Sequence, residues 1–299
     1  MTDEKSLAEL RRDIDRIDDS IQDLLWQRTD VVEEVRAYKH KRRVYRRGGF
    51  FRPSREIEIL RRLLRRHHGR FPEKGIVQIW RTIIASHLAG QEHFSLAVYR
   101  PKSKDPCLDL AREHYGAIVP TAYAASIAAV LKKVADRTVS AGVIPVPRKK
   151  DDAWWRHLVD RFDGLQIVAG LPFVDFEKDA GDVQAVIVAP MAPEPSSEDR
   201  SFLVVESERG IGPVRLAAAF AREKIAGRSF HRWRSQTGRR RSFSLVEVEG
   251  FFDGADPVLA RIRQHLGAAA LGVRVVGSYA VPLSGLKPKK NRKSSRGRT

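Results

Sequence analysis

Cysteine is almost missing from this chain of 299 residues, which contains only Cys107. A single cysteine excludes an internal disulfide framework and is compatible with a reducing cytoplasm, where we expect the protein to reside. Long apolar runs are missing too, and no stretch near the N-terminus has the length of a signal or membrane segment. We therefore expect neither secretion nor membrane insertion. The length suits two or three domains.

Neither proline nor glycine occurs between Leu7 and Lys39, so this stretch predicts one helix of about 50 Å. Its apolar residues follow a seven-residue repeat: Leu7, Leu10, Ile14, Ile17, Ile21, Leu24, Val31, Val35 and Tyr38. We call this stripe the apolar seam. Such a helix is too long to be covered by short partners of its own chain, and we expect it to pack against a second copy of itself.

Arg28 interrupts the apolar seam, and Arg11 and Lys39 flank it. A cation in an apolar seam needs a negative partner, so three of them predict a buried site for a small, multiply charged anion. Alternatively, Arg28 reaches the surface, pairs with a carboxylate such as Asp13 of a neighbouring helix, or fixes the register. Arg11 and Arg28 lie about 25 Å apart along the axis, so only an antiparallel dimer brings them to one small ligand.

Two shorter helices are expected next. Pro53 begins the first, because its missing N–H costs nothing in a first helical turn, and this helix extends to about His68. The second carries apolar residues at helical spacing over 76–91. The stretch 42–51 before Pro53 is rich in arginine and is predicted to be a solvated basic loop.

A set of residues is spread over the three expected helices: Leu10-Arg11, Ile14-Asp15, Asp18, Leu24-Leu25, Arg28, Val35, Lys39, Pro53-Ser54-Arg55-Glu56, Trp80-Arg81, Ile83-Ile84 and Ser86. With these residues at this spacing, the chain resembles the all-helical chorismate mutase family over residues 5–93. That family converts chorismate to prephenate, in the synthesis of phenylalanine and tyrosine, by a pericyclic step without nucleophile, metal or cofactor. The enzyme only has to hold the enolpyruvyl arm over the ring and stabilise charge on the breaking ether oxygen.

The resemblance implies roles for individual residues in an intertwined helical homodimer. Arg28 and Arg11 of the partner subunit would clamp the two carboxylates of the substrate. Lys39 would bridge a carboxylate and the ether oxygen, and Gln91 would donate to that oxygen from the third helix. The alternative for Gln91 is a solvated helix end.

Four further positions complete the implied binding set. Glu56 would accept from the ring hydroxyl while Arg55 orients the site, although both can equally be surface residues of a first helical turn. Arg52 and His87 depart from the family pattern. Arg52 stands where many relatives have an acidic or small residue, and His87 replaces the usual serine but can still donate to a carboxylate.

Beyond residue 94 the pattern changes to α/β. Strands are expected at 94–98, 139–146, 166–169, 183–188 and 202–205, and helices at 108–114 and 126–135. The stretch 141–147 resembles the periplasmic-binding-like α/β domain of prephenate dehydratase, which follows chorismate mutase in bifunctional proteins. The family's catalytic Thr-Arg-Phe falls at 200–202, which reads Arg-Ser-Phe, and its glycine-rich opening is replaced at 99–102. We therefore expect no dehydratase activity.

The portion 202–284 resembles a small βαββαβ regulatory domain of the ACT type. Strands are expected at 202–206, 242–249 and 273–279, and helices at 214–224 and 257–266. The motif that contacts phenylalanine in such domains has no clear counterpart at 228–235. This part could stabilise the dimer, bind an aromatic amino acid or dock another enzyme.

The expected fold is therefore multidomain, α followed by α/β. A three-helix mutase domain spans 1–93, a degenerate dehydratase-like domain 94–201, an ACT-like domain 202–284 and a disordered basic tail 285–299. The net charge of +18 raises a rival class, nucleic-acid-binding proteins. Aromatic residues do not interleave with the basic runs as stacking platforms do, so nucleic acid is not the expected partner. A second rival is a non-catalytic regulatory scaffold that keeps the mutase fold.

Overall fold

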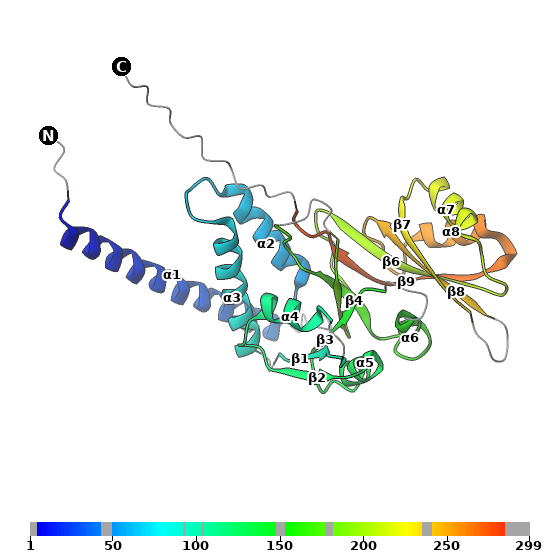
Figure 1. Cartoon of the computed structure of the whole chain (residues 1–299), viewed down its shortest axis with the longest axis horizontal. Helices are drawn as coiled ribbons and strands as arrows, with labels where there is room; N and C mark the ends of the chain where they lie inside the picture. The colour runs from blue at the N-terminus through cyan, green and yellow to red at the C-terminus, as the bar shows by residue number, and fades with distance from the viewer. Residues whose placement is uncertain are drawn as a thin grey trace, which may run out of the picture. The chain divides into compact units, whose positions relative to one another are not determined.

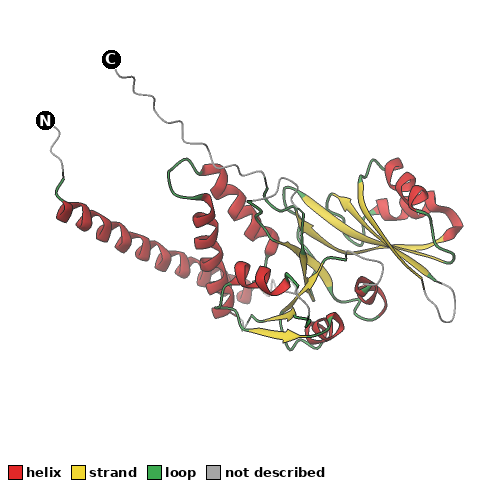
Figure 2. Cartoon of the chain, viewed as in Figure 1, coloured by secondary structure: helices red, strands yellow, loops and turns green. Residues whose placement is uncertain are grey.

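The computed structural model describes residues 5–42, 50–91, 94–102, 105–147, 153–176, 182–234 and 241–284. The chain divides into two compact units, Met1–Arg46 and Arg47–Thr299, and each is described by itself. A helical N-terminal region is followed by a large mixed sheet flanked by helices (Figure 1; Figure 2). The expected sequence of α and then α/β structure is confirmed at this level.

The first unit is the single helix α1 (Leu7–Lys41), which confirms the predicted long helix. Its start is fixed by two reciprocal bonds. The Glu9 N–H donates to Ser6 Oγ at 3.3 Å, and the Glu9 carboxylate accepts from the Ser6 N–H at 2.8 Å. The Ser6 hydroxyl also donates to the Glu9 carboxylate at 2.8 Å, and this bond, together with that from the Ser6 N–H, lowers the pKa of Glu9. A capped helix without proline or glycine runs on without a break.

The second unit begins with α2 (Pro53–Arg66) and α3 (Glu73–Gln91). Both helices bury one apolar face in the same core as residues of the sheet. From the helices this core contains Ile57, Leu60, Leu64, Val77, Ala85 and Leu88. The predicted boundary at residue 93 therefore falls within one compact unit, because α2 and α3 share their core with the sheet.

Polar contacts fasten α2 to the segment that precedes the sixth strand. Glu58 accepts hydrogen bonds from the backbone N–H of Ser197 at 2.9 Å and from its hydroxyl at 2.7 Å. Arg61 donates to the same hydroxyl at 2.6 Å and to the carbonyl of Val281 at 3.2 Å. The pKa of Glu58 is lowered by the bonds from Ser197 and by Arg61, against the opposing effect of burial.

Nine strands form one sheet in the order β2-β1-β3-β5-β4-β9-β6-β8-β7. The strands are β1 (Leu96–Tyr99), β2 (Thr121–Ala124), β3 (Ala141–Pro145), β4 (Gln166–Leu171), β5 (Ala185–Ala189), β6 (Asp199–Ser207), β7 (Gly227–Arg234), β8 (Ser242–Glu249) and β9 (Ala270–Ala280). The helices are α4 (Cys107–Tyr115), α5 (Ile127–Ala135), α6 (His157–Asp160), α7 (Pro213–Arg222) and α8 (Pro257–Leu266), with 3-10 turns at Trp154–Arg156 and Gly267–Ala269.

The two faces of the sheet bury different helices. Leu96 and Val98 of β1 lie in the core shared with α2, α3 and α4, whereas Ala97 lies in the core shared with α5. This alternation is the two-residue period of a strand covered on both faces. Further along the sheet, α7 and α8 pack together over β6 and β8.

The two halves of the sheet join where β4 meets β9. The two strands run parallel and pair at Ile167 and Gly277. Gly277 has a φ of +149°, and a Cβ there would lie 2.2 Å from the carbonyl oxygen of Ile167. Glycine is therefore needed at this position, because any side chain would meet the backbone of β4.

Most predicted elements of the α/β part are present with small shifts at their ends. Two strands were not placed from the sequence, β2 and β7, and they are the two edges of the sheet. From β6 to β9 the order is strand, helix, strand, strand, helix, strand, as expected for 202–284, but β6 begins at Asp199 and crosses the predicted boundary. The ACT-like identity of this part stays a prediction. The predicted tail at 285–299 lies outside the described residues.

Candidate functional site

The three predicted cations of the first unit all lie on α1. Arg28 and Lys39 are partly buried, and Arg11 is exposed. Arg28 and Lys39 are eleven residues apart, about three turns, so they project from the same face of the helix. Burial lowers the pKa of Arg28, yet a guanidinium remains a cation at neutral pH.

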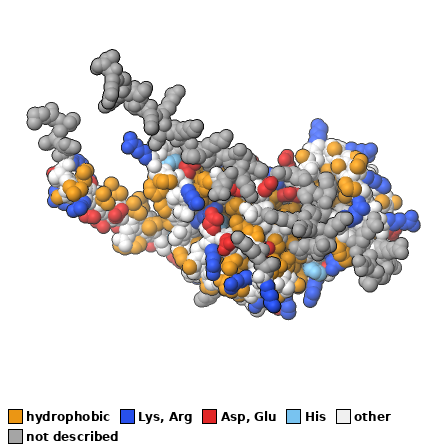
Figure 3. Space-filling model, viewed as in Figure 1, with side chains coloured by type: hydrophobic (Ala, Val, Ile, Leu, Met, Phe, Trp, Pro, Cys, Tyr) orange, Lys and Arg blue, Asp and Glu red, His pale blue; other side chains and the backbone are white. Residues whose placement is uncertain are grey.

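The apolar seam of α1 is exposed along its whole length. Leu7, Ile14 and Leu24, for example, are 64%, 56% and 62% exposed. Figure 3 shows hydrophobic side chains along the helix, interspersed with charged ones. A stripe of this size needs a partner surface, because a lone helix cannot cover its own seam.

The alternative prediction for Arg28 pairs it with a carboxylate such as Asp13 of a neighbouring helix. In this chain Asp13 accepts from Lys5 at 2.6 Å and from Arg16 at 2.8 Å. Lys5 precedes α1 and Arg16 lies on it, and the bond from Lys5 lowers the pKa of Asp13. The carboxylate is therefore already occupied by two cations of its own helix region.

Of the candidates at the start of α2, two face solvent and one faces the interior. Arg55 is exposed, and so is Arg52, whose Nε donates to a carboxylate oxygen of Glu194 at 2.9 Å. Glu56, in contrast, is only 5% exposed. Its Oε1 lies 3.0 Å from Nε2 of His114 on α4. This contact is close but poorly aligned, so we describe it as a polar pair and not as a directed hydrogen bond.

Glu56 belongs to a buried group of polar side chains from three helices, which we call the Glu56 cluster. It comprises Glu56 of α2, Arg81 of α3, and His114 and Tyr115 of α4. Burial lowers the pKa of Arg81, an effect that Glu113 and Glu56 oppose. Burial and the charge of Glu56 raise the pKa of Tyr115 well above its ordinary value.

Several polar atoms of the Glu56 cluster have no hydrogen-bond partner within the described residues. Nε and Nη2 of Arg81 and the hydroxyl of Tyr115 are buried without a hydrogen-bond partner among the described residues. Arg81 does contact Glu113, at 3.4 Å from Nη1, and Glu113 itself is about half exposed. The carboxylate of Glu56 is thus buried among donors that have no other partner within the described ranges.

Sequence reasoning did not assign a role to Arg81, His114 or Tyr115, although their spacing carried a signal. Arg81 follows Val77 by four residues and precedes Ala85 by four, which places it on the buried face of α3. On α4 the buried positions are Cys107, Leu110, Ala111, His114 and Tyr115, a regular helical stripe. A polar residue in such a stripe indicates a buried partner.

The two candidates on α3 are placed less fully. His87 is partly buried, and its Nδ1 lies 2.7 Å from the carbonyl of Ile83 in the same helix. Gln91 is the last residue of α3, and its side chain lies outside what the structure describes.

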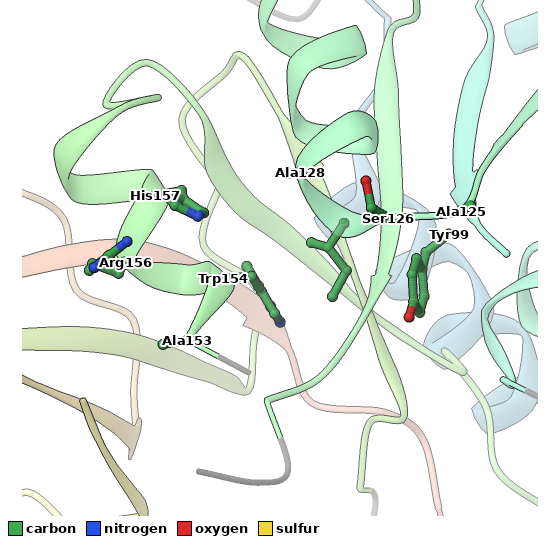
Figure 4. A pocket seen from close by; sticks show the side chains of 9 residues that line it. Tyr99, Ala125, Ser126, Ala128, Ala153, Trp154, Arg156 and His157 are labelled. Carbon is green, nitrogen blue, oxygen red and sulfur yellow. The ribbon is translucent and has the colours of Figure 1, made fainter. Parts of the chain in front are cut away.

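A cavity of about 380 Å³ opens at the carboxyl ends of β1 and β2. Figure 4 shows Tyr99 and Ser126 on one side and Trp154 opposite, with His157 and Arg156 beyond the indole. The Ser126 hydroxyl caps α5 by accepting from the N–H of Ala129 at 3.2 Å. The guanidinium of Arg156 stacks 3.9 Å from the centroid of the Trp233 ring, away from Ser126.

The positions predicted to replace the dehydratase motif lie inside the sheet. Ser201 is fully buried, donates to the carbonyl of Gly250 at 2.8 Å and pairs with the hydroxyl of Ser278 at 2.7 Å. It also accepts from the N–H of Phe252 at 3.0 Å. Arg200 is buried, with its Nη1 4.0 Å from a carboxylate oxygen of Asp182. The Ser201 hydroxyl is thus engaged in holding neighbouring segments together.

No described helix is both long and apolar enough to cross a membrane. No group of three or more His, Cys, Asp or Glu side chains within the described ranges is arranged to hold a metal ion.

Comparison with known proteins assigns the N-terminal segment. Residues 10–92 match the family model of type II chorismate mutases. A bifunctional chorismate mutase/prephenate dehydratase of Pseudomonas aeruginosa is 27% identical over 163 residues, which cover 54% of this chain and 44% of the relative. The bifunctional chorismate mutase/prephenate dehydratase of Aquifex aeolicus is 30% identical over 146 residues, 48% of this chain and 39% of the relative.

Both alignments contain more residues than the N-terminal segment, so they extend into the α/β part. The chain thus has an N-terminal segment of the chorismate mutase type followed by a region similar to prephenate dehydratases. It spans about two fifths of the length of these relatives. An X-ray structure of prephenate dehydratase from Streptococcus mutans aligns with a TM-score of 0.47 and 14% identity, over 64% of this chain and 99% of that one.

Proposed function

We propose that this chain is a chorismate mutase, which rearranges chorismate to prephenate in aromatic amino acid biosynthesis and works as a homodimer. The observation that carries the proposal is the position of Arg28 and Lys39 on one face of α1, beside an exposed apolar seam. The match of residues 10–92 to type II chorismate mutases supports it. A second copy of α1 would cover the seam and enclose the cations.

The proposed mechanism uses electrostatics and positioning alone. Arg28 and Arg11 of the partner subunit clamp the two carboxylates, which holds the enolpyruvyl arm over the ring. Lys39 spans a carboxylate and the ether oxygen, and Gln91 donates to that oxygen as its bond to the ring breaks. Negative charge that develops on the oxygen then meets donors already in place, so little reorganisation opposes the reaction.

The remaining candidates are proposed to shape the ring side of the site. Glu56 accepts from the ring hydroxyl, and Arg55, which is exposed in this chain, orients the substrate. His87 donates to a carboxylate in place of serine. Arg52 uses its Nε to bind Glu194, and its two terminal guanidinium nitrogens contribute positive charge to the site.

The test is direct conversion of chorismate. Purified full-length protein should turn chorismate into prephenate, and treatment with EDTA should not change the rate, because the proposed step needs no metal. Loss of chorismate absorbance measures both rates, and chromatographic separation from chorismate, followed by acid conversion to phenylpyruvate, identifies prephenate. Arg28→Ala protein serves as the control for non-enzymatic rearrangement. If chorismate stays unchanged in the presence of well-folded dimer, the proposal is contradicted. The remaining hypothesis is then a non-catalytic scaffold.

We also propose that the α/β part does not dehydrate prephenate. Dehydration needs a hydroxyl at the motif position, and the Ser201 hydroxyl is engaged with Gly250, Ser278 and Phe252. In the cavity beside Tyr99, the Ser126 hydroxyl caps a helix. Incubation with prephenate at neutral pH should therefore give phenylpyruvate only at the spontaneous rate, followed by its absorbance in alkali. A rate well above the protein-free control would refute this.

A further inference from the structure

We infer that His114 is a positioning residue for Glu56, so that α4 of the α/β part completes the mutase site. The inference rests on the proposed function and deepens it, because it concerns how one proposed site residue is held. Residues 10–92 match the mutase family and include Glu56, whereas His114 lies beyond that segment. A polar partner 3.0 Å from the Glu56 carboxylate thus comes from outside the part of the chain that carries the mutase match.

Packing fixes the orientation of the His114 ring. Its centroid lies 4.5 Å from that of Tyr115, in an edge-on arrangement at 80°, and 4.2 Å from that of Phe173. The side chain is only 2% exposed, so the ring has no room to turn toward solvent. With the ring held on two sides, Nε2 stays 3.0 Å from the Glu56 carboxylate.

Burial explains why Glu56 needs this partner. Its side chain is largely withdrawn from water, and a buried polar group without a partner is costly. Potential donors surround it: Arg81 from α3, and Tyr115 and His114 from α4. The carboxylate of Glu113 interacts with Arg81. Glu56 can accept from a substrate hydroxyl only when one of its carboxylate oxygens is turned toward that hydroxyl. His114 therefore acts on the reaction through Glu56 and not by touching the substrate.

Two substitutions distinguish the contribution of the His114 nitrogen from the contribution of its ring. His114→Phe keeps an aromatic ring between Tyr115 and Phe173 but removes the nitrogen that faces Glu56. His114→Gln keeps a donor of similar reach and removes the ring. We expect His114→Phe to lower kcat/KM for chorismate by about tenfold or more, and His114→Gln to stay within about threefold of the unsubstituted protein. A residue that only packs would give the reverse order, which would overturn the inference.

A double-mutant cycle tests the route through Glu56. In a Glu56→Gln background, His114→Phe should cause no further loss, because the group that His114 positions is already changed. Losses that multiply would show that His114 does not act through Glu56. The double variant also removes the buried charge that His114→Phe leaves without its partner. It therefore remains informative where the single variant folds poorly, as judged by its thermal midpoint.

Nitrogen NMR of histidine-labelled protein gives a readout that needs no turnover. The His114 resonance, identified by its absence in His114→Gln, should shift in Glu56→Gln protein. An unchanged resonance would show that the two side chains do not interact, and would overturn the inference. Turnover that is equal in His114→Phe and unsubstituted protein overturns the role of His114 alone. A folded chain without any turnover overturns the proposed function and the role of His114 with it.

Discussion

Arg28→Ala and Lys39→Ala are each expected to lower kcat/KM for chorismate by at least about a hundredfold, or roughly 2.7 kcal/mol of transition-state stabilisation. Each substitution removes a charge-assisted contact from a site that a second α1 would enclose and desolvate, where such contacts are strongest. Steady-state rates of chorismate loss, measured over a range of substrate concentrations, give kcat and KM separately.

Folding should survive both substitutions. Alanine favours a helix, and at position 28 it removes a partly buried charge from an apolar seam. Arg12→Ala is the matched control, because Arg12 is an exposed cation of the same helix outside the seam. It should leave kcat/KM nearly unchanged. Activity close to that of the unsubstituted protein in both Arg28→Ala and Lys39→Ala would show that these cations have only a structural role.

A mixture of Arg11→Ala and Arg28→Ala proteins is expected to regain activity that neither has alone. If Arg11 acts on the partner's site, a mixed dimer has one site with both arginines and one with neither. Random exchange of equal amounts makes about half of the dimers mixed, so activity should return to about a quarter of the unsubstituted level. The measurement is chorismate loss after subunit exchange, with mixed dimers verified by native mass spectrometry.

A second mixture provides the control for this experiment. Arg28 and Lys39 are proposed to serve the same site from the same chain. In a mixed dimer of Arg28→Ala and Lys39→Ala proteins, one site then lacks Arg28 and the other lacks Lys39. Such a dimer should stay inactive. If verified mixed dimers of the Arg11 and Arg28 variants remain as inactive as their parents, the two arginines do not meet across a dimer and the proposed arrangement is wrong.

The fold was predictable where the chain repeats a clear pattern. The missing proline and glycine and the apolar seam predicted α1 almost to the residue, and buried strands such as β3 and β5 follow from short apolar runs. The strands β2 and β7 were not predicted because they lie at the edges of the sheet. An edge strand pairs on one side only, and its sequence is accordingly short or polar, as in Gly227–Arg234.

The candidate site was predictable in part. A cation within an apolar seam is visible in a linear pattern, which is why Arg28 and Lys39 could be named. The partner of Glu56 could not, because His114 lies 58 positions further along and meets it only through the packing of α4 beside α2 and α3. The sequence pattern indicates which side chains are buried, but not which other side chain each of them contacts.

The shared core of α2, α3 and the sheet has a consequence for how such a chain can be assembled from parts. Relatives that join two activities suggest a fusion of separable modules, with the joint near residue 93. Here a cut at that joint would leave Ile57, Leu60 and Leu64 uncovered on one fragment and strip the face of β1 and β3 on the other. Neither fragment is a transferable module, so recombination that exchanges the mutase segment must carry the surface beneath it as well.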